Sequence, residues 1–274
     1  MYFFTNVMPK ARSLPCALSI AGLDPGGGAG IAADLRAFHK AGAFGCAVLA
    51  LTTVQSTRGL SRVVPLAAEL VVAQAREVLE NQHVRAVKLG ALGSRANVAA
   101  VVALLTEPAY AGLPLVVDPV MVPSRGPSSL LDPAALSTMR TRLLPRATLV
   151  TANTDEAATL TGLPVTTLTQ ARAAARALCE LGAQAAMVKG GHLRGPESVD
   201  VIAYADGSTL ELRSPRLPIR ARLHGGGCTF ASLVAGRLAT GQSLGRSLPW
   251  AKRTLQAALE RLVSVGGPLG VVVP

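Results

Sequence analysis

The sequence predicts an α/β protein in which a doubly wound, mostly parallel sheet is flanked by helices. Short apolar runs alternate with Ala-rich stretches of helical length along the whole chain. The runs are apolar at successive positions, as in strands that are buried on both faces. Half of the 274 residues are hydrophobic but only 3% are aromatic, so small aliphatic side chains must form the core. This composition favours helices packed on a parallel sheet over an aromatic-rich β-sandwich.

The apolar runs define the strands in order. They predict strands at 17–21, 46–53, 86–89, 115–117, 148–150 and 185–189. Helices are expected at about 30–41, 67–80, 228–239 and 244–262, and the apolar residues of the second of these share one face. Residues 199–212 alternate around an Asp206-Gly207 turn, which predicts a small antiparallel hairpin.

We find no linker or repeat, so one domain is expected over residues 15–274 after a flexible leader at 1–14. The N-terminal apolar patch precedes the charges, which is the wrong order for a signal peptide. No apolar run approaches the ~18 residues of a membrane span. The four cysteines are widely separated and contain no CxxC pair. These features predict a cytoplasmic protein without a membrane partner.

The chain is strongly basic, with 27 Lys and Arg against 16 Asp and Glu, a net charge of +11. Such a charge raises the possibility of nucleic-acid binding. However, the arginines are scattered and their densest group contains no aromatic residue on which bases could stack. We therefore expect no nucleic-acid partner. The excess charge solvates outward helix faces, or part of it receives a phosphorylated ligand.

Ligands of open α/β sheets bind outside the carboxyl ends of the strands, so the residues after each strand are the candidates for chemistry. The first strand is followed by a glycine-rich segment, 22–30, that leads into a helix. Its backbone amides could approach an anion, but a tight turn explains the glycines as well. Asp34 lies just inside the helix. The sequence favours a first-turn acid that complements the helix dipole over a buried ligand contact.

Polar residues follow the next strands. Gln55 lies in a run of amide and hydroxyl side chains that could recognise a heterocycle, although a plain polar loop is as good an interpretation. Asp118 directly follows a strand and suits Mg²⁺ or water. Asn153 and Glu156 have the spacing of a helix cap with an acid at its third position, which the pattern alone favours over a metal site.

Two segments indicate phosphate binding. Lys189 ends a strand beside Gly190 and Gly191, and a buried lysine there requires an anionic partner. Residues 224–229 read HGGGCT and lead directly into an apolar helix. Several free amides can therefore point at one anion. The same field is expected to lower the pKa of Cys228 and make it a base or nucleophile, unless it is only a small core residue.

Seven segments together, AGLDPGGGAGIAADL, TTVQST, VKLGALG, VVDPVMV, NTDEA, VKGGH and HGGGCT, resemble the hydroxymethylpyrimidine and phosphomethylpyrimidine kinases of thiamin biosynthesis, in the ribokinase-like superfamily. The resemblance covers nearly the whole chain. It implies a ribokinase-like fold, a homodimer, and ATP- and Mg²⁺-dependent phosphorylation of 4-amino-5-hydroxymethyl-2-methylpyrimidine and then of its monophosphate to the diphosphate.

The resemblance also implies roles at matching positions. Ala29, Asp34 and Ala91 line the pyrimidine pocket and Gln55 reads the ring. Asp118, Asn153 and Glu156 arrange Mg²⁺ and its waters, with Asp118 and Glu156 nearest the metal. Lys189 neutralises the phosphates, Gly225, Gly226 and Gly227 form the anion hole, and Cys228 is the catalytic base. The departures from the family include Gly226, where the family commonly has Thr, and Ala91, where it commonly has Met.

Two other functions stay open. One is a pyridoxal or pyridoxine kinase of the same lineage, because the ring and its hydroxymethyl group are similar. The other is a pyrimidine-binding regulator whose catalysis is impaired by Gly226. A hydrolase built on His224 and Cys228 is disfavoured, because no third residue is placed to orient the histidine.

Overall fold

The computed structural model describes residues 13–121, 130–218 and 222–274. A nine-stranded sheet has the order β3-β2-β1-β4-β5-β6-β7-β8-β9, and β10 and β11 form a second, two-stranded sheet. The strands are β1 (Cys16–Leu23), β2 (Phe44–Ser56), β3 (Gly59–Pro65), β4 (Val84–Leu89), β5 (Leu115–Val117), β6 (Leu149–Ala152), β7 (Ala185–Val188), β8 (Glu197–Tyr204), β9 (Thr209–Pro215), β10 (Arg222–His224) and β11 (Leu269–Val271). Residues 1–12 of the expected leader lie outside the described residues.

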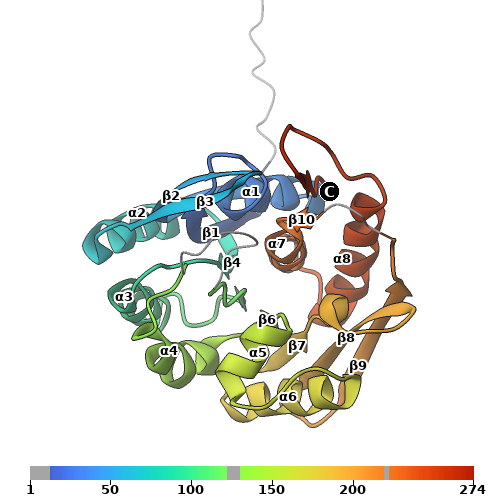
Figure 1. Cartoon of the computed structure of the whole chain (residues 1–274). Coiled ribbons are helices and arrows are strands. Elements are labelled where there is room, and N and C mark those ends of the chain that lie inside the picture. Colours follow the sequence, from blue (N-terminus) through green and yellow to red (C-terminus); the bar gives the residue numbers. More distant parts are fainter. Residues whose placement is uncertain (1–12, 122–129, 219–221) are drawn as a thin grey trace, which may run out of the picture.

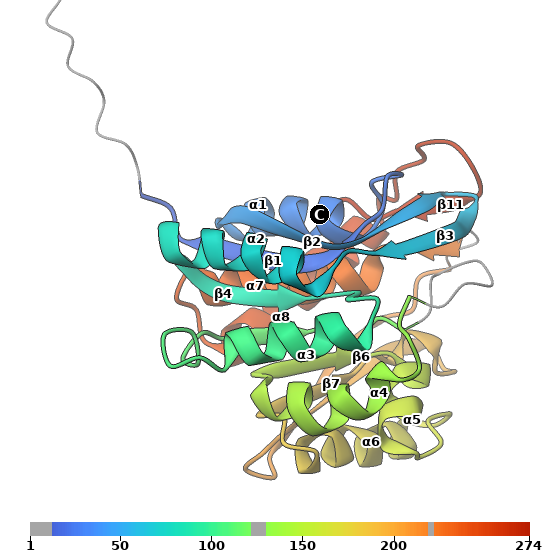
Figure 2. The same ribbon diagram turned by 90° about the vertical axis from the view of Figure 1, so that its left-hand side faces the viewer.

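Helices cover both faces of the sheet (Figures 1 and 2). The helices are α1 (Gly30–Ala41), α2 (Ala68–Asn81), α3 (Arg95–Leu105), α4 (Ala135–Thr138), α5 (Thr154–Thr161), α6 (Leu168–Glu180), α7 (Gly226–Ala239) and α8 (Leu244–Leu259). One apolar cluster joins α1, α7 and α8 to one face, and another joins α2 to α6 to the opposite face. The predicted doubly wound α/β class is therefore confirmed.

The central strands β2, β1, β4, β5, β6 and β7 are parallel, and antiparallel strands lie at both edges. Strands β8 and β9 form the predicted hairpin, which pairs with β7. At the other edge β2 continues to Ser56 and pairs with β3, a hairpin that the sequence did not indicate. The residues after Thr53 are polar and resemble a loop, but pairing with β3 keeps them in a strand.

Parallel strands β1, β2, β4, β5, β6 and β7 direct their carboxyl ends to the same side of the sheet. The chain passes from β1 to β2 on one side of β1 and later returns to β4 on the other. A crevice forms at such a reversal, between the loops that leave adjacent strands. Within the described residues, no helix combines the length and the apolar character that crossing a membrane requires.

Candidate active site

A cavity of about 920 Å³ opens at these strand ends. It is lined by every site residue predicted from the sequence except Asp34: Ala29, Gln55, Ala91, Asp118, Asn153, Glu156, Lys189, Gly225, Gly226, Gly227 and Cys228. Gln55 lies near the end of β2, residues 225–228 lie at the start of α7, and the others follow strands, so the topology of the sheet brings them together. The cavity therefore contains both an acidic and basic cluster and a glycine-rich helix start.

Lys189, directly after β7, is the cation at the centre of this cluster. Its Nζ donates to Asp118 Oδ1 at 2.9 Å and lies 3.9 Å from Glu156 Oε2. Burial disfavours the charged amine, but Asp118 and Glu156 outweigh that penalty and hold the pKa of Lys189 above its ordinary value. The ammonium is therefore charged, and it lies at the wall of the cavity.

The two carboxylates beside Lys189 share its charge. Burial acts to raise the pKa of Asp118, but Lys189 and Lys88 outweigh it and hold that pKa below its ordinary value. Burial raises the pKa of Glu156 to about 7, against the attraction of Lys189 and with the repulsion of Asp118. Because Asp118 and Glu156 share the single charge of Lys189, a second cation bound between them would be favourable. Carboxylate oxygens are ligands that suit Mg²⁺. The residues present thus fit a magnesium ion bound together with phosphate.

Asn153 and Glu156 also form the helix cap that their spacing predicted. Asn153 Oδ1 accepts the backbone N–H of Glu156 at 2.8 Å, and Glu156 Oε2 accepts that of Asn153 at 2.7 Å. This reciprocal capping box begins α5 and fixes the Glu156 carboxylate at the cavity wall. The structural and the functional interpretation of this pair are therefore compatible.

The start of α7 forms a cradle for an anion. Gly225, its N-cap, has φ +85°, and a Cβ there would lie 1.8 Å from Gly28 O, so only glycine fits. A Cβ on Gly227 would lie 3.1 Å from Lys189 Nζ and thus fill the space next to the ammonium. The first amides of α7 and the Lys189 charge therefore face the same space, as required for binding a phosphate.

The expectation of a low thiol pKa at Cys228 is wrong. Burial raises the pKa of Cys228 to about 12; Lys88 opposes this rise, and the negative charge of Asp118 and Asp34 adds to it. In the free protein at neutral pH, the loss of hydration and the nearby carboxylates outweigh the helix field, and Cys228 is a thiol rather than a thiolate.

Asp34 has neither of the roles that the sequence suggested. It is fully buried, lies beyond the first turn of α1 and does not line the cavity. Its carboxylate accepts hydrogen bonds from Lys88 Nζ at 2.9 Å, Ser19 Oγ at 2.6 Å and Ser232 Oγ at 2.7 Å. Burial disfavours the charged form of Lys88, but the attraction of Asp34 is larger and holds the pKa of Lys88 above its ordinary value. The residue that Asp34 supports, Lys88, lines the cavity instead.

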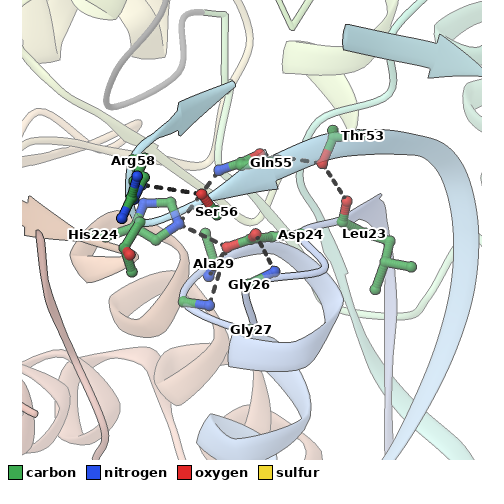
Figure 3. Close-up of polar contacts among 12 residues, drawn as sticks. Leu23, Asp24, Gly26, Gly27, Ala29, Thr53, Gln55, Ser56, Arg58 and His224 are labelled. Atoms are coloured by element: carbon green, nitrogen blue, oxygen red, sulfur yellow. Dashed lines mark hydrogen bonds and ion pairs between the residues drawn. The ribbon is translucent and has the colours of Figure 1, made fainter. Parts of the chain in front are cut away.

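The sequence did not indicate a second polar group at the cavity, shown in Figure 3. His224 Nε2 lies 2.7 Å from Asp24 Oδ2, and both side chains are buried. Gln55 Nε2 lies 3.3 Å from His224 Nε2, and Gln55 Oε1 lies 3.3 Å from Thr53 Oγ1. Both glycine segments are evident in the sequence, but pairing of their Asp and His requires the fold. The only available signal was a His directly before three glycines.

Three residues that the sequence did not single out, Asp200, Lys252 and Arg216, hold the loop after Lys189 in place. Asp200 Oδ1 accepts the Gly190 N–H at 2.8 Å, and Lys252 donates to Asp200 Oδ2 at 2.6 Å. Arg216 donates to the carbonyl oxygens of Gly191 and Gly195, at 2.7 and 2.8 Å. Asp200, Lys252 and Arg216 line the same cavity. One end of the cavity is thus rigid around Lys189.

Known proteins are similar in sequence to most of this chain. A hydroxymethylpyrimidine/phosphomethylpyrimidine kinase of Streptomyces coelicolor is 44% identical over 94% of this chain and 93% of the relative. The protein of the same description from Rhizobium meliloti is 42% identical over 89% of this chain and 90% of its own. These relatives align with nearly their whole length.

Solved structures share the fold. Pyridoxal kinase from Staphylococcus aureus in complex with AMP-PCP and pyridoxal has a TM-score of 0.85 and 30% identity, covering 95% of this chain and 93% of its own. Phosphomethylpyrimidine kinase from Clostridium difficile has a TM-score of 0.76 and 31% identity, covering 89% and 99%. The expected ribokinase-like fold is confirmed. Residues 24–272 match the family described as phosphomethylpyrimidine kinase, and the chain belongs to that family.

Proposed function

We propose that this protein is an ATP-dependent kinase of thiamine biosynthesis that phosphorylates 4-amino-5-hydroxymethyl-2-methylpyrimidine and then its monophosphate to the diphosphate. The observation that carries the proposal is the position of Lys189. Its ammonium is held by two buried carboxylates and faces the space at the glycine start of α7. A cation and free amides that converge on one space are what phosphoryl transfer requires.

Phosphoryl transfer depends mostly on positioning and on charge stabilisation. Lys189 and the amides of Gly225 to Cys228 hold the transferred phosphoryl group near the substrate oxygen. Asp118 and Glu156 would hold Mg²⁺, which supplies further positive charge to the phosphates. The loop around Gly190, fixed by Asp200 and Arg216, keeps Lys189 from moving away as charge develops.

Cys228 is proposed as the base of the first phosphorylation only. There the hydroxymethyl group must lose a proton as its oxygen attacks. In the second reaction the attacking group is a phosphate that is already ionised and needs no base. The raised pKa of Cys228 means that only a small thiolate fraction is available at neutral pH. A thiolate with a high pKa is, however, a strong proton acceptor.

We also propose a homodimer formed through the β2–β3 ribbon. Thr52 pairs with Val64 and Val54 with Arg62, so Val54 and Val64 lie on one face of this ribbon. Both side chains are exposed, Val54 at 58%. Strand β3 is also the edge strand of the sheet, so its outer side has no partner strand within the described residues. Covering such an apolar edge favours a second copy. Light scattering should give a dimer for the unaltered chain and a monomer for Val54→Lys, and an unaltered chain that is monomeric would contradict this assembly.

The cysteines support a cytoplasmic location. All four are free thiols, and Cys16 and Cys46 lie on the adjacent strands β1 and β2 without a disulfide. Burial, together with the neighbouring Cys16, raises the pKa of Cys46 to about 12. Cysteines without disulfides are typical of a reducing compartment.

The proposed activity is tested by ADP release with hydroxymethylpyrimidine, its monophosphate and pyridoxal, each with and without Mg²⁺. We expect turnover of both pyrimidines that requires Mg²⁺ and falls by at least ~100-fold in Lys189→Met. The exposed Lys40→Met is the matched control and should retain activity. No turnover of any of the three substrates would refute the kinase assignment.

Pyridoxal is included because a specific observation favours it as a second substrate. The S. aureus pyridoxal kinase matches this fold with a higher TM-score than the C. difficile phosphomethylpyrimidine kinase, 0.85 against 0.76. Higher kcat/KM for pyridoxal than for both pyrimidines would establish the pyridoxal kinase instead. Binding of a pyrimidine without ADP release would favour the regulator.

A further inference from the structure

The contacts around His224 connect the two glycine segments of the site (Figure 3). Asp24 lies in the loop after β1 and His224 ends β10, directly before the N-cap of α7. Their side chains are each 3% exposed and approach to 2.7 Å. The ring of His224 packs so closely on Gly28 that a Cβ there would lie 2.2 Å from its Cδ2. The position of the ring is therefore fixed.

The proton of this contact belongs to His224. Asp24 accepts backbone N–H groups from Gly26 at 2.9 Å, Gly28 at 3.0 Å and Ala29 at 2.9 Å, and three such donors on both oxygens favour the ionised carboxylate. Burial acts against this charge, but His224 and the amides hold the pKa of Asp24 below its ordinary value. His224 therefore donates from Nε2, and its Nδ1 is buried without a partner among the described residues.

This proton decides how the amide of Gln55 is oriented. The two ends of a side-chain amide have almost the same shape, so the nitrogen and the oxygen are assigned from the donors and acceptors around them. With Nε2 toward His224, two N–H donors face each other across 3.3 Å. The Thr53 hydroxyl would also need its one proton for both Gln55 Oε1 and Leu23 O, which it contacts at 2.8 Å. The opposite orientation removes the facing pair of donors and frees the Thr53 proton for Leu23 O, and it requires only that the His224 proton be shared with Asp24.

In that orientation Gln55 Oε1 accepts from His224 Nε2, and the Gln55 amide donates to Thr53 Oγ1 while the hydroxyl donates to Leu23 O. The one Nε2 proton of His224 is then shared between Asp24 Oδ2 at 2.7 Å and Gln55 Oε1 at 3.3 Å, and no two donors face each other. We propose that Asp24, His224 and Thr53 form a relay that fixes the Gln55 amide in one orientation and so determines which heterocycle the cavity accepts. Asp24, His224 and Thr53 are positioning residues in this scheme, and Gln55 is the group that touches the substrate.

The inference rests on the proposed function and deepens it. An amide of fixed orientation presents its donor and its acceptor in one order. A 4-aminopyrimidine offers an N–H donor next to a ring-nitrogen acceptor. The corresponding pyrimidinone, with an oxo group in place of the amino group, offers the reverse order, an acceptor next to a ring N–H. An amide free to rotate would accept both rings, whereas the relay selects one.

The test compares the aminopyrimidine with the pyrimidinone that bears the same hydroxymethyl group. The readout is the ratio of their kcat/KM values with ATP. In His224→Leu we expect this ratio to fall about tenfold, mainly through KM, because the amide is no longer fixed. His224→Gln, whose amide keeps a donor for both Asp24 and Gln55, should restore the ratio to within about twofold. A purely structural role would lower both activities and leave the ratio unchanged.

Thr53→Val provides an independent variant, because Thr53 lies in β2 and outside the glycine loops. It should lower the ratio as His224→Leu does, and Thr53→Ser should keep it. His83→Leu, at an exposed position outside the cavity, is the matched control and should leave the ratio unchanged. An unchanged ratio in both His224→Leu and Thr53→Val, or an equal fall in His83→Leu, would overturn the relay.

A second measurement does not depend on turnover. Nitrogen NMR of the histidine side chains should show His224 with its proton on Nε2 in the unaltered, ligand-free protein. A proton on Nδ1 alone would overturn the relay. If the unaltered protein turns over neither pyrimidine, the proposed function fails, and this spectrum still decides whether His224 donates as inferred.

Discussion

Lys88, which is fully buried, and Lys189, which is half-buried, bring positive charge to the site, and each is stabilised by a carboxylate 2.9 Å away. An isolated ammonium at these positions would lose its hydration without compensation. The carboxylates, in turn, are more numerous than the cations around Lys189. This excess of buried negative charge makes the ligand-free site unstable at higher pH and ready to bind a further cation.

Glu156 shows this cost in a measurable form. Its pKa is about 7 in the folded protein against 4.5 for an unperturbed glutamate. Between these two pH values the Glu156 carboxyl holds a proton in the folded state that the unfolded chain has released. The contribution of Glu156 to the free energy of unfolding is therefore fully present below about pH 4.5 and is lost as the pH rises through about 7.

Replacing Glu156 by Gln should therefore stabilise the ligand-free protein at pH ~8, by about 1–3 kcal/mol, because the capping contact remains and the buried charge is removed. At pH ~5 the two proteins should melt alike, because the carboxyl is then protonated. Thermal melts in EDTA measure the difference. A gain of the same size at both pH values would show that charge burial is not its cause.

Cys228→Ala should separate the two phosphorylations. We expect the first to slow by roughly 100-fold and the second by less than about threefold, because only the hydroxymethyl group needs a base. Since the pKa of the thiol is raised to about 12, the first reaction of the unaltered enzyme should also accelerate from pH ~7 to ~9. Single-turnover rates for each substrate provide the comparison, and equal losses in both would argue against the thiol as base.

At the scale of secondary structure, the start of α7 determines what the site can hold. Gly225 is fixed by its positive φ and by Gly28 O. A Cβ added at Gly226 would have no heavy atom within 4 Å, and the φ of Gly226 is not positive. The chain therefore tolerates a side chain at Gly226 but not at Gly225. Gly227 tolerates one only at the expense of the space beside Lys189.

Substitutions along this turn should have different effects. Gly226→Thr restores the hydroxyl that the resemblance places here and should raise kcat severalfold over Gly226→Ala, which controls for backbone stiffening. Gly227→Ala should fold normally but lose at least ~10-fold in kcat/KM, because its Cβ enters the phosphate space. Steady-state kinetics and thermal melts decide both. Full activity in Gly227→Ala would place the phosphates elsewhere.

The strands and helices that depend on buried apolar runs were predictable from the sequence. Such runs gave the bounds of β5, placed those of β7 within one residue and placed those of β1 and β4 within two. The β2–β3 hairpin was not predictable, because the polar residues around Gln55 lack the apolar signal and are strand only through pairing with β3. Partners distant in sequence were also missed. Asp34 meets Lys88 across 54 positions and Asp24 meets His224 across 200, and local patterns contain no information on such pairs.

At the scale of the whole molecule, the doubly wound sheet assembles the site from loops that are far apart in sequence. The same chain carries a net charge of +11. Some arginines have structural roles rather than facing water only: Arg146 donates to the carbonyl oxygens of Leu105, Tyr110 and Leu113, and Arg76 pairs with Glu107. The remaining charge acts at long range.

This long-range field should assist the approach of ATP. Raising the salt concentration from about 0.05 to about 0.3 M shortens the Debye length by roughly half and screens the field, so KM for ATP should rise a fewfold with little change in kcat. The KM for the neutral pyrimidine should show no such dependence, and it is the internal control. A KM for ATP that does not respond to salt would show that binding depends on local contacts alone.

Two successive phosphoryl transfers to a pyrimidine at one site are the central claim about this molecule. The most direct test follows hydroxymethylpyrimidine, ATP and Mg²⁺ with the enzyme by phosphorus NMR. We expect a pyrimidine monophosphate that appears first and is then converted to the diphosphate while ADP accumulates. ADP that accumulates with inorganic phosphate alone, and no phosphorylated pyrimidine, would contradict the claim.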